Sequence, residues 1–310
     1  MNQEHTVIER IWKKKTLLEN NDPHHKTIKP LLLILGGGNL GVYGAAACYA
    51  LQMLGLGNIF DTVIGISTGA WVGGYYLAGL EQIKIGTSIY YEDFASPEYI
   101  TARNFPFVMN RSIIESATSR GQKKLDIRAV QNATSNFFVG VTDLNGKGHF
   151  LDAKKAAPSL WSALYASSAT PLAYAAPCEV NSNLYIDGGI ALTFPIKDVV
   201  EQFAPTDVLV LPNCPREQKH AATFCERAYI KLFLSHLPYA VRARTLLRHE
   251  DFCAGALFAN NARAVQILWP PNAGIRALSK NPQKLREAAY ASARNTLTMF
   301  GKSGLAFELY

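Results

Sequence analysis

The chain has 310 residues, of which 48% are hydrophobic, so it can bury a core that needs neither disulfides nor a structural metal. Its formal net charge of +7 comes from scattered basic residues rather than a stripe with interleaved aromatics, which argues against nucleic acid as a partner. The five cysteines are odd in number and have no paired metal-ligand spacing, so we expect reduced thiols and neither a metal site nor a bound cofactor.

The N-terminal segment, residues 1–29, is polar, and within it Met1–Asn20 alternates charged and apolar residues with no continuous apolar run. It lacks the pattern of a secretory signal peptide, so we expect a cytoplasmic protein, with no disorder beyond this segment. Within it, Trp12 and the basic run Lys13–Lys15 support a hypothesis of peripheral membrane contact, for which a solvated helix face is the alternative.

Two strand-turn-helix units follow this segment. Leu31–Leu35 is a short apolar run ending in glycines, as in a buried parallel strand, and Gly41–Leu54 is small and apolar enough for a packed helix. Asp61–Ile66 and Thr68–Leu80 repeat this plan. Charge-free stretches here are long enough to cross a bilayer, but their glycines and sharp turns favour buried helices over a transmembrane span. The plan predicts a parallel sheet with helices on its faces.

The rest of the chain continues the mixed pattern and becomes mainly helical beyond Pro215. The pair at residues 145–146, Asn-Gly, predicts a hairpin between two strands, and Asn281 before a proline predicts the cap of the last helix. The predicted strands are Asn136–Leu144, His149–Leu151, Leu184–Ile186, Asp207–Leu211 and Val265–Trp269, and the predicted helices are Pro158–Ala166 and a last helix through about Phe300.

The pattern Gly-Ile-Ser-Thr-Gly at residues 65–69 matches a nucleophile elbow, in which a serine sits on a strained turn between a strand and a helix. Gly65 and Gly69 are needed because side chains there would collide where the chain doubles back. The amide of Thr68, at the start of the helix, points toward developing negative charge. This predicts Ser67 as an exposed nucleophile, with a small-residue turn as the alternative.

The glycine-rich turn Gly36–Gly41 leaves backbone amides unshielded at a helix N-terminus. Such a turn can form an oxyanion hole or cradle the pyrophosphate of a dinucleotide. Gly36, Gly38 and Gly41 satisfy the dinucleotide spacing, with Asp61 about twenty residues further on. Asp61, however, begins the second strand, and the end of that strand, where a ribose-binding acid belongs, carries the elbow. The oxyanion hole is therefore the favoured interpretation.

A third motif is Asp187 followed by Gly188 and Gly189, directly after a predicted strand. A carboxylate at a strand end, with glycines that let a partner backbone approach, is well placed to act on a neighbouring hydroxyl. A structural aspartate that caps a turn is the alternative.

These motifs together resemble the patatin-like phospholipase family. The resemblance implies an α/β fold with three α/β/α layers around a mostly parallel sheet. It also implies a catalytic core over residues 30–215 and a mainly helical C-terminal region, 216–310, packed on that core. The matching blocks are Gly36–Gly41, Gly65–Gly69, Ala166–Pro171 and Asp187–Gly189, which lie within about half of the chain.

The resemblance also implies a Ser-Asp dyad without histidine, with Ser67 as nucleophile and Asp187 as base. A free aspartate, with a pKa of ~3.9, is a weak base at neutral pH, so we expect a partly desolvated site that raises its basicity. The implied oxyanion donors are the amides of Gly37 and Gly38, joined in the predicted hole by Gly36 and Thr68. The motifs are supported by Asn39, Gly41, Gly65, Gly69, Gly188 and Gly189.

One residue departs from the family pattern: Leu40 stands where the glycine motif usually has Arg or Lys. Lipid ester hydrolysis is therefore implied more directly than a preference for phospholipids. The expected function is that of a lipid acyl hydrolase, of phospholipase A, lysophospholipase or carboxylester hydrolase type, acting on a lipid or phospholipid ester. The sequence does not determine the oligomeric state.

Two alternatives remain open. A Ser-His-Asp esterase would need His220, His236 or His249 as its base, although all three lie in predicted helices with no strand-end loop to present them. A non-catalytic relative that binds lipid or nucleotide would not need the intact serine, aspartate and glycine motifs.

Overall fold

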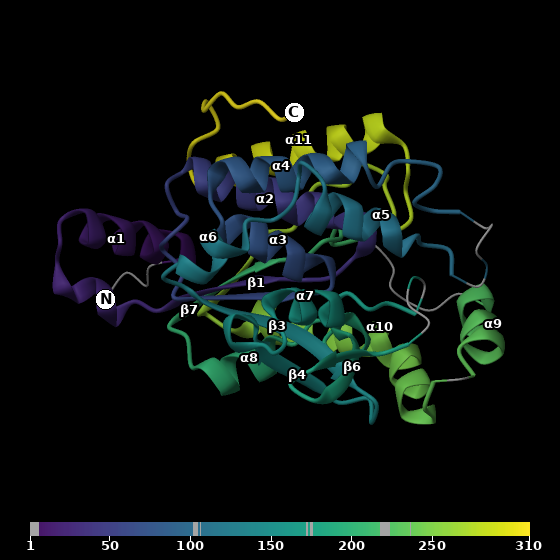
Figure 1. The fold of residues 1–310 in the computed structure, drawn as a ribbon. Helices are drawn as coiled ribbons and strands as arrows, with labels where there is room; N and C mark the ends of the chain where they lie inside the picture. Colours follow the sequence, from purple (N-terminus) through teal and green to yellow (C-terminus); the bar gives the residue numbers. More distant parts are fainter. Residues whose placement is uncertain are drawn as a thin grey trace.

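One mixed sheet lies at the centre of the fold, between two layers of helices (Figure 1). The computed structural model describes residues 6–101, 105, 107–171, 173, 176–217, 224–235 and 237–310. The strand order is β5-β6-β3-β2-β1-β7-β8, with β4 paired to β3. The strands are β1 (Pro30–Ile34), β2 (Thr62–Ile66), β3 (Asn136–Asp143), β4 (Gly148–Asp152), β5 (Cys178–Val180), β6 (Asn183–Asp187), β7 (Asp207–Leu211) and β8 (Val265–Ile267).

Helices α2, α3, α4 and α11 stack above the sheet in Figure 1, and α8 and α10 lie below it. This confirms the predicted three-layer α/β/α architecture with a mainly helical C-terminal region. The helices are α1 (Val7–Glu19), α2 (Gly41–Met53), α3 (Thr68–Leu77), α4 (Leu80–Glu92), α5 (Arg111–Glu115), α6 (Ile127–Asn132), α7 (Leu160–Ser167), α8 (Ile196–Phe203), α9 (Phe224–Phe233), α10 (Tyr239–Asn261) and α11 (Pro282–Met299).

The sheet is mostly parallel. The pairs β3–β2, β2–β1, β1–β7 and β7–β8 are parallel, whereas the pairs β3–β4, β3–β6 and β5–β6 are antiparallel. The parallel arrangement follows from the two predicted strand-turn-helix units, whose helices return the chain to the same edge of the sheet. The predicted hairpin between β3 and β4 and the cap of α11 by Asn281 are also confirmed.

Three local features differ from the sequence prediction. The predicted helix Thr68–Leu80 ends earlier, at Leu77, because Gly79 adopts a φ of +107° and a new helix, α4, begins at the next residue. The short edge strand β5 and the helix α8 were not predicted. In α8 the buried residues are Ile196 and Val199, a spacing that fits one face of a short helix.

The N-terminal segment contributes a helix to the core. Thr6 caps α1 in a capping box with Glu9, and Val7 and Ile11 are buried on the face that packs against the sheet. Lys14 is also buried and pairs with the carboxylate of Asp61. The polar composition of the segment therefore belongs to the outer face of a packed helix.

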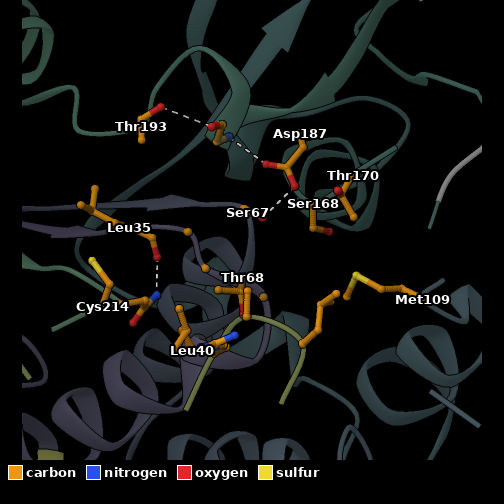
Figure 2. A pocket seen from close by; sticks show the side chains of 18 of the residues that line it. Leu35, Leu40, Ser67, Thr68, Met109, Ser168, Thr170, Asp187, Thr193 and Cys214 are labelled. Carbon is orange, nitrogen blue, oxygen red and sulfur yellow. Dashed lines mark hydrogen bonds between the residues drawn. The ribbon is translucent and has the colours of Figure 1, made fainter. Parts of the chain in front are cut away.

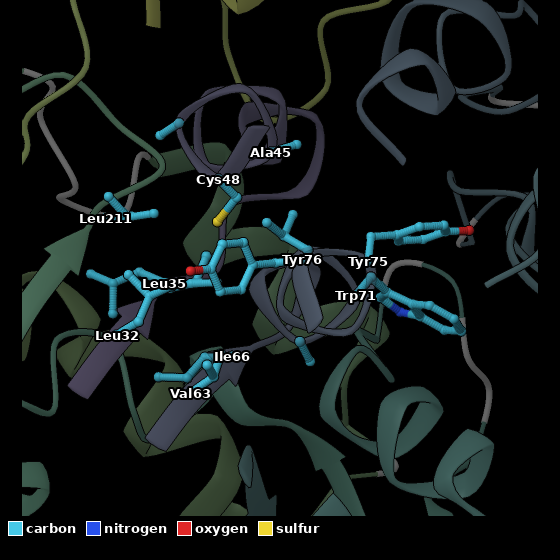
Figure 3. Close-up of a cluster of buried hydrophobic side chains, with 14 of the residues drawn as sticks. Leu32, Leu35, Ala45, Cys48, Val63, Ile66, Trp71, Tyr75, Tyr76 and Leu211 are labelled. Carbon is cyan, nitrogen blue, oxygen red and sulfur yellow. The ribbon is translucent and has the colours of Figure 1, made fainter. Parts of the chain in front are cut away.

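The core joins the central strands to α2 and α3 (Figure 3). All five residues of β1 are buried, as expected for a parallel strand covered on both faces. From the helices, Cys48 and Tyr76 are among the buried side chains, so the charge-free stretches are covered by protein. Over the described residues, no helix is both long and apolar enough to span a membrane.

The substitution Ile11→Ala tests whether α1 is an integral part of this core. Ile11 has no exposed surface, so its truncation is expected to lower the free energy of unfolding by about 2–5 kcal/mol. Urea unfolding would measure the change. The matched variant Lys13→Ala, at an exposed position of the same helix, is expected to stay within about 0.5 kcal/mol of the wild type. Equal stability of both variants would contradict the packing of α1.

Candidate active site

Strand β3 brings the predicted nucleophile and base together. Ile66 of β2 pairs with Gly140, and Asp187 of β6 pairs with the next residue of β3, Val141. Ser67 and Asp187 therefore meet at the same point along β3 although they are 120 residues apart in sequence. The Ser67 Oγ donates a hydrogen bond of 2.8 Å to the Asp187 Oδ2 (Figure 2).

The turn at Ser67 has the strained geometry expected of an elbow. Ser67 has a φ of 55° and a ψ of −124°, a conformation that L-residues rarely adopt. A Cβ added at Gly65 would lie 2.4 Å from the backbone of α3, and one at Gly69 would lie 2.3 Å from the Ile34 carbonyl oxygen. The close approach explains why both flanking positions are glycine.

The end of α7 holds the elbow against β3. The Ser67 amide donates to the Ser167 Oγ over 3.0 Å, and this hydroxyl donates to the Gly140 carbonyl over 2.6 Å. The Asp187 amide donates to the Ala169 carbonyl over 3.2 Å. The segment Ala166–Pro171 therefore supports both residues of the pair. In the sequence it stood out through the family resemblance alone, because no local pattern assigns it a role.

The glycine-rich turn lies directly beside Ser67. A Cβ added at Gly36 would lie 3.0 Å from the Ser67 Cβ, and Gly38 has a φ of +59° that favours glycine. No described residue accepts a hydrogen bond from the amides of Gly37, Gly38 or Thr68. The turn and the elbow end two adjacent parallel strands, so these amides lie at the same edge of the sheet as the serine.

Asn39 and Gly41 fasten this turn to its surroundings. The buried Asn39 amide group donates to the Phe94 carbonyl over 3.2 Å and to the Ser279 carbonyl over 2.7 Å. A Cβ added at Gly41 would lie 2.4 Å from the Oγ1 of Thr68. The hydroxyl group of Thr68 is hydrogen-bonded to the hydroxyl group of the buried Tyr90. Both predicted supporting residues therefore sit at close contacts between the turn and neighbouring segments.

Asp187 is a buried carboxylate, 7% exposed. Burial raises its pKa above the ordinary value, and hydrogen bonds from Ser67 and the Gly189 amide and the charge of Arg248 oppose the rise. The amide of Gly189 donates to the Asp187 Oδ1 over 2.7 Å. A Cβ added at Gly188 would lie 2.1 Å from the carbonyl oxygen of Gly140 on β3. The raised pKa agrees with the expectation of a partly desolvated base.

A cavity of about 1320 Å³ opens onto Ser67 and Asp187. Its walls are largely apolar and come from the helices α3, α4, α9 and α10 and from the residues Tyr99 and Met109. Leu40, at the position where a cation would be usual, is a buried apolar residue, whereas Arg248 and Arg276 line the cavity from the C-terminal region. Positive charge therefore reaches the cavity from another part of the chain.

The histidines considered as alternative bases are placed only in part. His220 and His236 lie outside the described residues. His249 lines the cavity from α10, and its ring nitrogens lie 3.9 Å from the Cys253 Sγ. Within the described part of the chain, no hydrogen bond to Ser67 or Asp187 comes from an imidazole.

The described residues do not form the dinucleotide site or a metal site. Asp61 precedes β2, at the opposite end of the strand from the glycine-rich turn, and it pairs with Lys14. It therefore cannot contact a ribose bound at that turn. Within the described ranges, no three His, Cys, Asp or Glu side chains are grouped so as to hold a metal ion.

Asn213 is a buried residue of the site that the sequence analysis did not single out. It follows β7 and accepts a hydrogen bond of 2.8 Å from the Gly44 amide, while its side-chain amide donates to the Leu35 carbonyl. It thus joins the start of the glycine-rich turn to α2. Its place just after a predicted strand was the available signal, but no local motif distinguishes it.

Comparison with models of protein families agrees with the sequence resemblance. The sequence model of the family described as Patatin-like phospholipase matches residues 32–200. Among solved structures, the chain is similar to the crystal structure of VipD from Legionella pneumophila, at 12% identity and a TM-score of 0.43, covering 89% of this chain and 67% of that chain. A search of curated proteins found no match.

The substitution Asn213→Ala tests how the glycine-rich turn is held. It leaves the Gly44 amide and the Leu35 carbonyl without this partner in a buried region, which is expected to cost about 1–3 kcal/mol of stability for each group. The measurement is urea unfolding, with the exposed Asn260→Ala as the matched control. A loss no larger than that of the control would contradict the role of Asn213.

Proposed function

This chain belongs to the patatin-like phospholipase family, and we propose that it hydrolyses lipid esters with Ser67 as the nucleophile and Asp187 as the base. Membership of this family supports lipid acyl hydrolase activity in general. The observation that carries the finer proposal is the direct hydrogen bond of 2.8 Å between the Ser67 hydroxyl and the Asp187 carboxylate. A serine hydroxyl needs such a base within hydrogen-bond reach to act as a nucleophile.

In the first step, the Ser67 Oγ bonds to the ester carbonyl carbon while its proton passes to Asp187. The carbonyl oxygen becomes an oxyanion and accepts hydrogen bonds from the amides of Gly37 and Gly38, with Gly36 and the Thr68 amide completing the hole. These amides are preorganised because glycines bring the turn against the elbow. As the oxyanion collapses, the carbon–oxygen bond to the alcohol breaks, and the protonated Asp187 returns its proton to the leaving oxygen.

In the second step, water hydrolyses the acyl-serine. Asp187 removes a proton from the water molecule as the water oxygen attacks the acyl carbon. The same amides donate hydrogen bonds to the second oxyanion. Collapse releases the fatty acid and returns the proton to the Ser67 Oγ. The raised pKa of Asp187 supports this role, because a more basic carboxylate takes up the proton more readily.

The cavity supports an ester with a long apolar acyl chain as the substrate. Beside Ser67, it is lined by Trp71, Tyr75, Phe94 and Met109, which offer apolar surface for such a chain. The buried Leu40 supplies no cation, and among the described residues that line the cavity the cations available to a phosphate group are Arg248 and Arg276. Carboxylester hydrolysis is therefore the core of the proposal, and phospholipase A or lysophospholipase action is its more specific form.

Single substitutions separate the dyad from a histidine-based mechanism. Ser67→Ala and Asp187→Asn are each expected to lower kcat/KM for p-nitrophenyl butyrate by about 1000-fold or more, because they remove the attacking hydroxyl and its base. A fluorophosphonate probe should label the wild type and not Ser67→Ala.

The controls are His220→Ala, His236→Ala and His249→Ala. Each is expected to keep activity within a few-fold of the wild type, about 1 kcal/mol in transition-state stabilisation or less. A loss in any of them comparable to that of Ser67→Ala would overturn the dyad. Failure of the probe to label the folded wild type would favour a non-catalytic relative.

The fall of kcat/KM at acid pH, the acid limb of the pH profile, should reflect protonation of the Asp187 carboxylate. Burial raises its pKa, and only the ionised carboxylate can accept the Ser67 proton, so kcat/KM should fall as pH decreases through that raised value, above the ~3.9 of a free aspartate. Arg248→Gln removes a positive charge that lowers this pKa, so the limb should move to higher pH. Arg248→Lys keeps the charge and should leave it in place. A limb that moves to lower pH in Arg248→Gln would contradict the assignment.

A further inference from the structure

Exposed large apolar side chains gather on α9 and α10. Leu232 is 65% exposed, Tyr239 77% and Leu257 64%. Leu246, Leu247 and Phe258 on α10 are also exposed. Single exposed apolar residues are ordinary on a protein surface, but a group of them on two neighbouring helices marks an interaction surface.

Four exposed residues of α10 form a stripe on one side of the helix, whereas Leu247 and Phe258 lie roughly 100° from this stripe around the helix axis. Tyr239, Leu246, Cys253 and Leu257 follow one another at intervals of seven, seven and four residues. At roughly 100° per residue, these intervals place all four within about 40° of one another around the helix axis. The buried residues of the helix, Val241, Phe252 and Ala259, fall on the opposite side. The stripe therefore points away from the core.

The same two helices form a wall of the catalytic cavity. Leu246 of the stripe lines the cavity, as do Ile230 and Leu234 on the inner side of α9. Ile230 and Leu234 pack in one cluster with Ile186 and Ile190, which lie on either side of Asp187 in sequence. The apolar stripe is thus continuous with the surface that leads to the Ser-Asp pair.

Cations accompany the stripe. The Arg242 guanidinium lies 5.9 Å from the centre of the Tyr239 ring, and Lys231 is exposed beside Leu232 on α9. Arg248, in contrast, lies on the opposite side of α10 at the cavity, and the exposed Glu250 adds an acid within the stripe, so the nearby cations are Arg242 and Lys231. Apolar side chains flanked by cations, on a chain of net charge +7, fit an anionic lipid surface, which offers a hydrocarbon layer beneath negative headgroups.

We propose that the outer face of α9 and α10, centred on Leu232, Tyr239 and Leu257, docks the protein on the surface of an anionic lipid aggregate. This proposal rests on the proposed function, because a hydrolase of insoluble esters must open its cavity toward the lipid. Docking through this face places the cavity wall against the aggregate, so that a lipid can pass over Leu246 toward Ser67.

The basic run on α1 is a poorer candidate for this contact. Lys14 is buried and paired with Asp61, and the Trp12 ring packs against Phe300. Figure 1 places α1 and α9 at opposite ends of the molecule. Docking through α1 would therefore turn the α9–α10 side of the cavity away from the lipid.

The test is co-sedimentation of the full chain with vesicles of equal parts phosphatidylglycerol and phosphatidylcholine. The double variant Tyr239→Ser, Leu257→Ser is expected to lower vesicle partitioning at least about tenfold, because two large apolar side chains no longer enter the interface. Leu232→Ser on α9 should lower it independently. The matched control Met299→Ser, Leu305→Ser changes two exposed apolar residues on α11 and the C-terminal segment and should bind as the wild type does.

Hydrolysis of soluble p-nitrophenyl butyrate distinguishes this proposal from the proposed function. None of the substituted residues lines the cavity, so the variants should retain wild-type activity on this ester, which also verifies their fold. If the wild type binds vesicles but does not hydrolyse the ester, and the double variant no longer binds vesicles, the proposed function is refuted and the docking proposal is supported.

Three results would overturn the docking face. The first is a wild type that fails to bind the vesicles. The second is binding that survives in the Tyr239→Ser, Leu257→Ser variant and is lost when Trp12 and Lys13 are replaced. The third is a wild type that forms dimers in solution and is dissociated by the double variant without any change in vesicle binding, which would assign the face to a second copy of the chain.

Discussion

Pairing of β3 with both β2 and β6 is the constraint from which the candidate site follows. The two partners run in opposite directions against β3, and the C-terminal end of each arrives at Gly140 and Val141. Because side chains alternate along a strand, a slip of β6 by one residue would turn the Asp187 carboxylate to the other face of the sheet. The hydrogen bond from Ser67 therefore depends on a register set by the whole sheet.

Backbone contact between two turns is the second level of organisation. The glycine-rich turn and the elbow end adjacent strands, and they lie so close that a side chain at Gly36 would meet Ser67 and one at Gly69 would meet the backbone at the end of β1. Asn213 and Ser167 add hydrogen bonds from β7 and α7. A region fixed from several sides can hold bare amides in place without reorganisation, which is the physical requirement for stabilising an oxyanion.

The C-terminal region adds electrostatics and a surface to this core. Asp187 is removed from solvent, and the nearby cation that moderates its pKa, Arg248, belongs to α10. The same helix lines the cavity and carries the exposed apolar stripe, and Leu246 belongs to both. A contact made on the exposed stripe of α10 therefore lies next to the cavity in which the reaction is proposed to occur. Leu40 replaces the cation that is usual in the family's glycine motif, which fits a cavity whose positive charge comes from Arg248 and Arg276 of the C-terminal region.

The sequence by itself determined the strand-turn-helix units, the strained turn at Ser67, the cap of α11 and the family. Each of these depends on neighbouring residues, whose apolar spacing, glycines and capping side chains act over a few positions. The short elements β5 and α8 escaped prediction because a few residues carry little periodic signal. The family resemblance implied that Ser67 pairs with Asp187, but only the tertiary structure showed their hydrogen bond, the supporting contacts of Ser167 and Asn213, and the burial of α1. These contacts join residues far apart in sequence, so they exist only once strand order and register have brought their segments together.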